Sequence, residues 1–160
     1  MLRDMVRDFA KNEVQPLARE MDATGKFPLD LVRQMGDLGL MGIPISEKYG
    51  GAGMDTVAYA LAVMELAKVD ASLAITMSAH TSLGTVPIVL TGTEEQKQKW
   101  LPKIANEALS AFCLSEPNVG CDAQGQDTTC ELSECGKFYV INGEKKWATS
   151  AAQSCMFTVM

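Results

Sequence analysis

Residues 111–122 read AFCLSEPNVGCD, and at this stretch the helical pattern of the sequence gives way to a pattern of short strands. The first half predicts a strand, and the Pro and Gly that follow predict a tight polar loop with a closely approachable backbone. Such a loop presents backbone N–H groups to an anionic or carbonyl-bearing ligand. The alternative is a strand-end turn in which Ser115 and Asp122 cap their own backbone.

The sequence before this stretch predicts helices. Apolar residues recur at helical spacing, and capping residues and prolines mark the boundaries. Residues 71–83 are apolar and small-sided almost all round, which predicts burial on several faces. The predicted helices cover residues 2–21 (bent or split at Pro16), 28–39, 56–69 (capped by Asp55), 71–83 (opened by Asp70 or Ser72) and 87–92, with a last one that is opened by the Thr93–Gln96 capping box and ends near Asn106.

The sequence after this stretch predicts strands at 127–132 and 138–142, which are joined around Ser133–Gly136. Asn142-Gly143 is a hairpin signal, so a further strand is expected at 144–149, and another from Gln153. Helices first and antiparallel strands second is an α+β order. We therefore predict a helical domain over 1–107 and an incomplete antiparallel β-domain over 108–160, a fragment at both ends.

The composition excludes several classes of protein. The 160 residues are 47% hydrophobic and 21% charged, with a formal net charge of -6, which argues against disorder and against binding the phosphate backbone of nucleic acids. No apolar run reaches 18 residues, so no membrane span is expected. The N-terminus has no apolar core of a secretion signal, and its acids argue against a transit peptide.

Cysteine usage gives two further expectations. The five Cys form no C-x-x-C pair, and the chain has a single His, so no metal site is expected. Without a secretion signal, the cysteines are interpreted as free thiols in a reducing compartment.

A second segment, EKKWATS at 144–150, carries candidate binding chemistry. Trp147 beside the hydroxyl of Thr149 is suited to wall a planar aromatic ligand and to offer it one hydrogen bond. The alternative is a core tryptophan on a β-hairpin, with the preceding charges forming a solvated hairpin edge.

Other residues also allow two interpretations. Glu116 is either catalytic or a structural hydrogen-bonding group, because proline follows it. His80 lies among small residues and is interpreted as a core or interface histidine rather than a catalytic one. The ten Met are interpreted as gap-filling core residues.

Taken together, the two segments resemble the acyl-CoA dehydrogenase family, whose signature is a Leu/Val-Ser/Thr-Glu-Pro…Gly-Ser-Asp loop followed by a Trp-Ile-Thr-Asn strand. The resemblance is collinear over essentially the whole chain, and residues 78–84 are similar in texture to the short-chain, butyryl-type members. It is also carried by VRDFA (6–10), LGLMGIP (38–44), EKYGG (47–51), SAHTSLG (78–84), EEQK (94–97) and NGEKKW (142–147).

The resemblance implies a helical N-terminal domain, a middle β-domain and a C-terminal helical bundle. It implies an FAD-dependent oxidoreductase that converts a fatty acyl-CoA to the trans-2-enoyl-CoA and passes electrons to an electron-transfer flavoprotein. The family's catalytic Glu belongs to the C-terminal bundle beyond Met160, so no catalytic residue is expected in this chain and the fragment alone is expected to be inactive. A homotetramer is implied for the full-length form, in the cytoplasm of a bacterium or the mitochondrial matrix of a eukaryote.

The resemblance also implies site residues. The Ser115 hydroxyl and neighbouring N–H groups would contact the isoalloxazine ring, Trp147 would pack beside it, and Thr149 would hydrogen-bond near N5. Cys121 stands where the family has a Ser that helps to hold FAD or the CoA moiety. Val119, Ala148 and Ser150 also depart from the family pattern. The implied cofactor-binding residues are Phe112, Cys113, Leu114, Ser115, Gly120, Cys121, Trp147, Ala148 and Thr149, with Cys121 also implied in substrate binding and no residue in metal binding.

Two alternatives to such a dehydrogenase remain open. The first is a non-catalytic remnant that acts as an interaction module. The second is a related flavoenzyme on the same fold, an acyl-CoA oxidase or a flavin monooxygenase, which fits the same residues.

Overall fold

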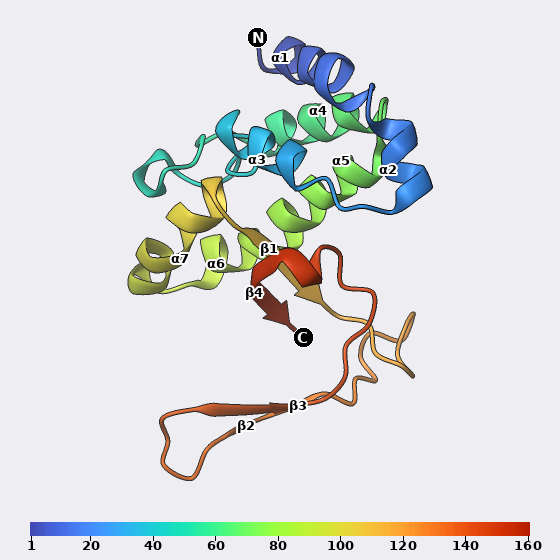
Figure 1. The fold of residues 1–160 in the computed structure, drawn as a ribbon. Helices are drawn as coiled ribbons and strands as arrows, with labels where there is room; N and C mark the ends of the chain where they lie inside the picture. Colours follow the sequence, from blue (N-terminus) through green and yellow to red (C-terminus); the bar gives the residue numbers. More distant parts are fainter.

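The computed structural model describes residues 1–160 and places the helices before the strands (Figure 1). This order confirms the α+β fold class. The helical elements are α1 (Leu2–Phe9), the π-helical η1 (Ala10–Val14), α2 (Ala18–Thr24), α3 (Leu29–Asp37), the 3-10 helix η2 (Glu47–Tyr49), α4 (Thr56–Ala67), α5 (Ala71–Ser78), the π-helical η3 (Ala79–Thr85), α6 (Val86–Thr91), α7 (Glu94–Asn106) and the 3-10 helix η4 (Ala151–Gln153). The strands are β1 (Leu109–Cys113), β2 (Thr129–Leu132), β3 (Tyr139–Asn142) and β4 (Ser154–Val159).

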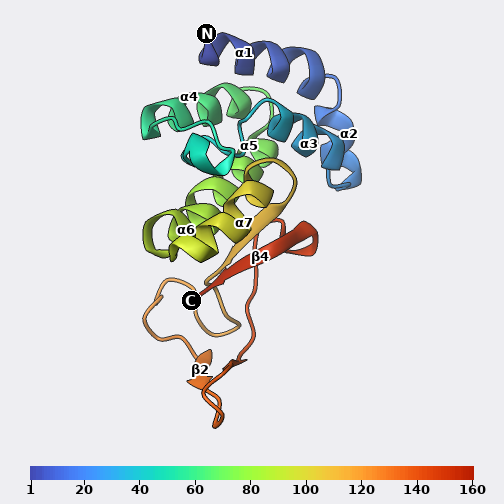
Figure 2. The ribbon, with the colours of Figure 1, turned by 90° about the vertical axis from the view of Figure 1, so that its left-hand side faces the viewer.

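The helices stack in layers, with α1 and α4 at one end and α6 and α7 beside the strand pair β1–β4 (Figures 1 and 2). The β2–β3 hairpin projects away from this body (Figure 1). The body is held by a core cluster that joins α1, α3, α4, α5 and β1. Its buried residues are Val6, Phe9, Ala10, Val14, Leu31, Val32, Met35, Leu40, Met41, Ile43, Ala62, Leu66, Leu73, Ala74, Met77 and Leu109.

The capping signals of the sequence lie where they were predicted. The Asp55 carboxylate accepts the Ala58 N–H at 2.9 Å at the start of α4, and the Asp70 carboxylate accepts the Leu73 N–H at 2.6 Å at the start of α5. Thr93 and Gln96 form the expected capping box of α7. Side-chain oxygens thus satisfy amide donors that a helix N-terminus leaves without partners.

The first predicted helix is split near Pro16, as expected. The π-helical turn η1 ends at Val14 and α2 begins at Ala18. Proline has no N–H to donate and crowds the preceding turn, so the helix cannot run straight through it.

One buried ion cluster was not anticipated. The Glu65 carboxylate on α4 lies 3.2 Å from Arg3 and 3.0 Å from Arg7 on α1, and 2.7 Å from Lys68. These cations lower the pKa of Glu65 to about 2, first through the Arg7 hydrogen bonds and then through Lys68. The charged side chain is buried because its oxygens are fully paired, and it fixes α1 against α4.

The elements α5, η3 and α6 form one continuous helix over Ala71–Thr91 that is long and apolar enough to cross a membrane by length and composition. The sequence predicted two helices here, over 71–83 and 87–92, and no membrane span, because Ser, Thr and Gly interrupt the apolar run. Leu73, Met77 and His80 are buried against other elements, so we interpret the continuous helix as a core helix. Ile75 and Leu83 are exposed, so part of its surface is open to solvent.

The strand pairing differs in part from the antiparallel expectation. β2 and β3 are antiparallel, with Thr129 opposite Asn142, but β1 and β4 are parallel, with Cys113 opposite Val159. The chain makes the β2–β3 excursion and returns to the starting end of β1 before β4 begins. Parallel pairing needs such a long crossover.

The expected strand at 144–149 is absent, and Asn142-Gly143 does not form the hairpin turn. The hairpin turn between β2 and β3 lies at Ser133–Gly136, as predicted, and Gly136 there has a φ of +67°. Gly143 is needed for close approach, because a Cβ there would lie 2.2 Å from Thr128 Oγ1. The turn-forming dipeptide is therefore used for backbone packing.

Candidate functional site

The loop that follows β1 is closed by its own backbone. The Glu116 N–H donates to the Val119 carbonyl at 3.0 Å, and the Val119 N–H donates to the Glu116 carbonyl at 3.3 Å. Pro117 lies inside this turn and fixes one of its φ angles. Val119, one of the residues that depart from the family pattern, is buried. Its side chain therefore anchors the loop and does not crowd it.

The second candidate segment lies directly beside this loop. The Lys146 N–H donates to the Ser115 carbonyl at 2.7 Å, which joins positions that are about thirty residues apart in sequence. Trp147 follows with a φ of +60° and an exposed fraction of 90%. The indole is therefore presented to solvent and is not the core tryptophan of the alternative interpretation.

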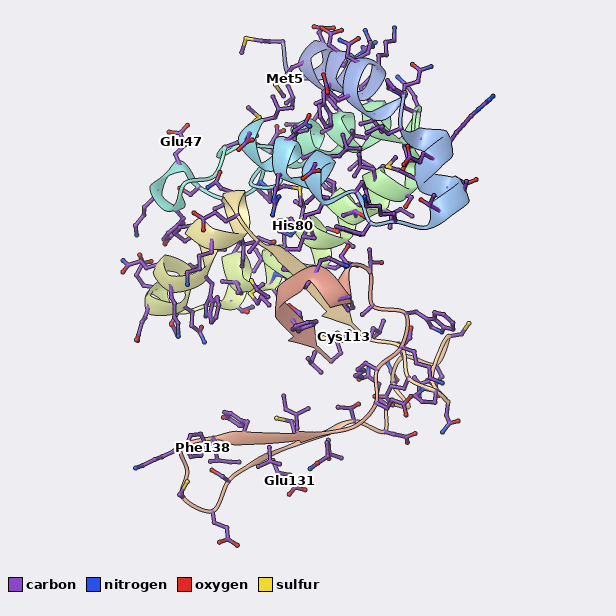
Figure 3. The ribbon with its side chains drawn as sticks, in the orientation of Figure 1. Met5, Glu47, His80, Cys113, Glu131 and Phe138 are labelled. Atoms are coloured by element: carbon purple, nitrogen blue, oxygen red, sulfur yellow. The ribbon has the colours of Figure 1, made fainter.

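The predicted site residues fall into four groups. Phe112 and Cys113 belong to β1, with Cys113 buried at its end (Figure 3). The Ser115–Lys146 hydrogen bond brings the start of the loop to the second segment, whereas Gly120 and Cys121 are exposed farther along the loop and make no hydrogen bond to that segment. The two groups joined by this bond are Leu114 and Ser115 on one side and Trp147, Ala148 and Thr149 on the other.

The wall formed in this way carries unused hydrogen-bond donors. The amide N–H of Ser115 and the hydroxyl of Thr149 make no hydrogen bond within the chain, and the amide N–H groups of Gly120 and Cys121, farther along the loop, are free as well. A Cβ built on Gly120 would meet no atom within 4 Å, so the backbone there is open to a close neighbour. An exposed aromatic face beside free N–H and O–H donors fits a planar ring that carries hydrogen-bond acceptors.

The contacts of Glu116 support a structural hydrogen-bonding role and not a catalytic one. Its carboxylate lies 2.6 Å from Lys145 Nζ and accepts the backbone N–H groups of Asp127 and Thr128 at 2.6 and 3.0 Å. These contacts, with the Lys145 hydrogen bond the largest cause, lower the pKa of Glu116 to about 2. A carboxylate whose oxygens are taken by fixed donors is a poor proton acceptor for a substrate.

Lys145 was missed by the sequence analysis. It was placed on a solvated hairpin edge with Glu144 and Lys146, yet its side chain is only 11% exposed. Two adjacent lysines look alike in sequence, and the register that turns one inward depends on the irregular backbone of this segment. A buried partner for Glu116 was the only available signal, and it required the tertiary contact to be known.

His80 is a core histidine, as interpreted, and it lies where η3 meets β1 (Figure 3). The Ser110 N–H donates to its Nδ1 at 3.0 Å, while the hydroxyls of Ser110 and Thr85 donate to the His80 carbonyl at 3.0 and 2.8 Å. Because Nδ1 accepts a hydrogen bond, the ring is neutral with its proton on Nε2. Burial lowers the pKa of His80 to about 4, so the ring stays neutral near neutral pH. The hydrogen bonds with Ser110 hold the strand that leads into the loop.

The cysteines are all unpaired, and no cluster of metal-ligating side chains is present. Burial raises the pKa of the Cys113 thiol, so it is unreactive near neutral pH. The hydrogen bond with Ser133 lowers the pKa of Cys135 in the exposed hairpin turn.

Surface pockets are present elsewhere on the molecule. One of about 350 Å³ is formed between α2 and α3 by side chains that include Leu17, Met21 and Phe27. At the candidate site, Trp147 is 90% exposed and a Cβ on Gly120 would meet no atom within 4 Å. These parts of the candidate site are therefore open to solvent.

Comparison with known families gives two adjoining matches. The family described as "Acyl-CoA dehydrogenase, N-terminal domain" matches residues 1–108, and "Acyl-CoA dehydrogenase, middle domain" matches residues 111–160. Together they cover nearly the whole chain.

Individual proteins agree with this. The chain is 47% identical to a short-chain specific acyl-CoA dehydrogenase of Clostridium acetobutylicum over 99% of its own length and 42% of that protein. An acyl-CoA dehydrogenase of Bacillus anthracis, solved in complex with FAD, superposes with a TM-score of 0.93 at 41% identity, covering 99% of this chain and 28% of that one. A structure described as an electron transferring flavoprotein of Acidaminococcus fermentans gives a TM-score of 0.94 at 42% identity, with 99% and 42% covered. The chain spans about 40% of the length of the curated relatives that it matches.

Proposed function

Because the chain belongs to the acyl-CoA dehydrogenase family, we propose that its β1 loop and its Trp147 segment form one wall of an FAD site. The reaction proposed for the whole protein is oxidation of a fatty acyl-CoA to the trans-2-enoyl-CoA. FAD, when bound, supplies the acceptor for the hydride from the β-carbon.

A single contact carries the proposal. The Lys146 N–H to Ser115 carbonyl hydrogen bond, at 2.7 Å, holds the two family-like segments side by side. It links the segment that carries the exposed indole to the segment that carries the free N–H of Ser115. Together, the two segments form one surface of the right chemistry for a flavin ring.

The residues of this wall act by binding and orienting. The indole of Trp147 would cover one part of the ring and exclude water from it, and the Thr149 hydroxyl would donate a hydrogen bond to the ring. The Ser115 N–H and hydroxyl would donate to acceptors on the ring. Cys121 offers a thiol, a weaker donor than the hydroxyl of the family's serine, so its contact with FAD or CoA contributes less.

Glu116 is not the base in this proposal. The base must accept the α-proton of the thioester, and Glu116 is buried and held by Lys145 and two amide donors. The proton acceptor is therefore not Glu116.

The proposed substrate class is a short-chain fatty acyl-CoA, because the chain is 47% identical to a relative that is described as short-chain specific. The proposed electron acceptor is an electron-transfer flavoprotein. A chain with this fold occurs in a structure that is described as an electron transferring flavoprotein, which supports the proposal. A homotetramer and a matrix or bacterial cytoplasmic location remain part of the proposal.

We expect FAD to bind the chain weakly and to quench Trp147. The Trp100→Phe variant leaves Trp147 as the only indole, because the chain has two Trp. Titration with FAD should quench its emission saturably, but the flavin should not be retained through gel filtration, because the wall is open. Free N-acetyltryptophanamide corrects for absorption by FAD. A linear quench that matches this control would contradict the proposed site.

We expect no dehydrogenase turnover from the 160-residue chain. Glu116 is engaged in its ion pair, so the carboxylate of this residue is not free for α-proton removal. The measurement is reduction of an artificial electron acceptor with butyryl-CoA and added FAD. Turnover above that of the heat-denatured chain would show that a base is present and would overturn this expectation.

A further inference from the structure

The Glu116 carboxylate joins three segments of the chain. It lies in the loop after β1, and its Oε2 accepts the Asp127 N–H at 2.6 Å. Its Oε1 accepts the Thr128 N–H at 3.0 Å and the Lys145 ammonium at 2.6 Å. Because the residue is only 5% exposed, these donors replace water around the charge.

The Lys145 ammonium is saturated in the same way. Besides Glu116, it donates to the Leu114 carbonyl at 3.2 Å and to Gln126 Oε1 at 3.1 Å. An ammonium group has three protons to donate, and all of them find acceptors here. Removal of either partner leaves a buried charge without its counterion, which is far more disruptive than loss of an exposed ion pair.

The position of this pair relative to the flavin-facing wall gives it a further consequence. Lys145 is two residues before Trp147, and Glu116 directly follows Ser115. Trp147 is 90% exposed, so its indole has little packing that fixes its place. The relative position of the two halves of the wall is therefore set by the Lys146–Ser115 backbone hydrogen bond and by the ion pair beside it.

We propose that Glu116 and Lys145 are positioning residues that hold the Ser115 half and the Trp147 half of the wall in register for flavin binding. The inference rests on the proposed function. It goes beyond that function by giving Glu116 the role of orienting the two halves of the wall. The hydrogen bonds from the Asp127 and Thr128 N–H groups need an acceptor at position 116. The glutamate and the lysine therefore cannot exchange places.

The test compares FAD titrations of single variants in the Trp100→Phe background. Lys145→Met and Glu116→Gln are expected to raise the half-saturating FAD concentration at least tenfold, and Lys145→Arg to restore most of the loss. The charge-reversed double variant E116K/K145E is expected not to recover, because a lysine at 116 cannot accept the two amide N–H groups. Recovery in the double variant would show that the two residues can exchange places and would overturn that part of the proposal.

Two matched controls separate positioning from general loss of stability. Lys137→Met removes an exposed lysine between β2 and β3, outside the wall, and should leave FAD binding unchanged. Thr93→Ala removes the cap of α7, so it should lower the Tm without changing the half-saturating concentration of the folded protein. Unchanged FAD binding in both Lys145→Met and Glu116→Gln would overturn the proposal.

Amide hydrogen exchange tests the pair independently of the flavin. Lys145→Met should speed exchange at Asp127 and Thr128, and at the Lys146 N–H that bonds the Ser115 carbonyl, whereas Lys137→Met should leave all three unchanged. If the unmodified chain binds no FAD, the proposed function fails, and the exchange results still decide whether the pair orders the wall. Exchange equal to that of the unmodified chain would then refute it.

Discussion

Replacing His80 by Asn is expected to remove a pH-dependent part of the stability worth about 3 kcal/mol. The pKa of His80 is about 4 in the folded chain, against 6.5 for an unperturbed histidine. The unfolded chain therefore binds a proton between pH 6.5 and pH 4 that the folded chain excludes. The stabilisation is complete above pH 6.5, falls by about 1.4 kcal/mol per pH unit below it, and is exhausted near pH 4.

Asparagine is the matched substitution because its side-chain oxygen can accept the Ser110 N–H that Nδ1 accepts in the native chain, and because it does not titrate. Free energies of unfolding from urea titrations at pH 7, 6, 5 and 4 give the measurement. The difference between the unmodified chain and His80→Asn should shrink steadily as the pH falls, since the contributions of Glu65 and Glu116 cancel in the subtraction. A difference independent of pH would mean that the ring takes up a proton in the folded chain as easily as in the unfolded one.

Gly84→Ala is expected to lower the free energy of unfolding by about 3 kcal/mol, at the upper end for overpacked cores. A Cβ at this position would lie 2.4 Å from Ser110 Oγ and 2.9 Å from the Ser110 backbone carbon. Because a backbone atom of β1 cannot rotate away, the strand itself must shift from η3. That shift also breaks the Ser110 hydrogen bonds to His80.

The control for this prediction is Gly120→Ala, because a Cβ there meets nothing within 4 Å. Its free energy of unfolding should stay within about 0.5 kcal/mol of that of the unmodified chain. The double variant of Gly84→Ala and His80→Asn should lose less than the sum of the single losses, since both act on the same contact between η3 and β1. Equal losses from Gly84→Ala and Gly120→Ala would contradict the close packing of β1 on the helix.

The helical half of the fold was largely predictable because its signals are local. Asp55, Asp70 and the Thr93–Gln96 box place helix starts through contacts within three residues, and Pro16 breaks a helix through its own ring. The irregular segment around Gly143 was not predictable in the same way. A hairpin signal there is overridden by the approach of Thr128, which belongs to another segment.

The candidate site was likewise predictable where its signals are local and not where they depend on tertiary contacts. The residue types in 112–121 and 147–149 are visible in the sequence, and the contact between Ser115 and Lys146 confirms that the two segments meet. The burial of Lys145 and the use of Glu116 as its partner depend on register and on amides from a third segment. Sequence spacing carries no information about such a three-way contact.

The backbone of Trp147 has a consequence for how this position varies over evolutionary time. A bulky residue at a φ of +60° is strained by about 1–3 kcal/mol, and an indole that is 90% exposed returns little of it through burial. Selection for folding alone would therefore favour glycine or asparagine at this position. A lineage that kept the fold but lost its ligand should drift to those residues, so a retained tryptophan marks stability given up for recognition.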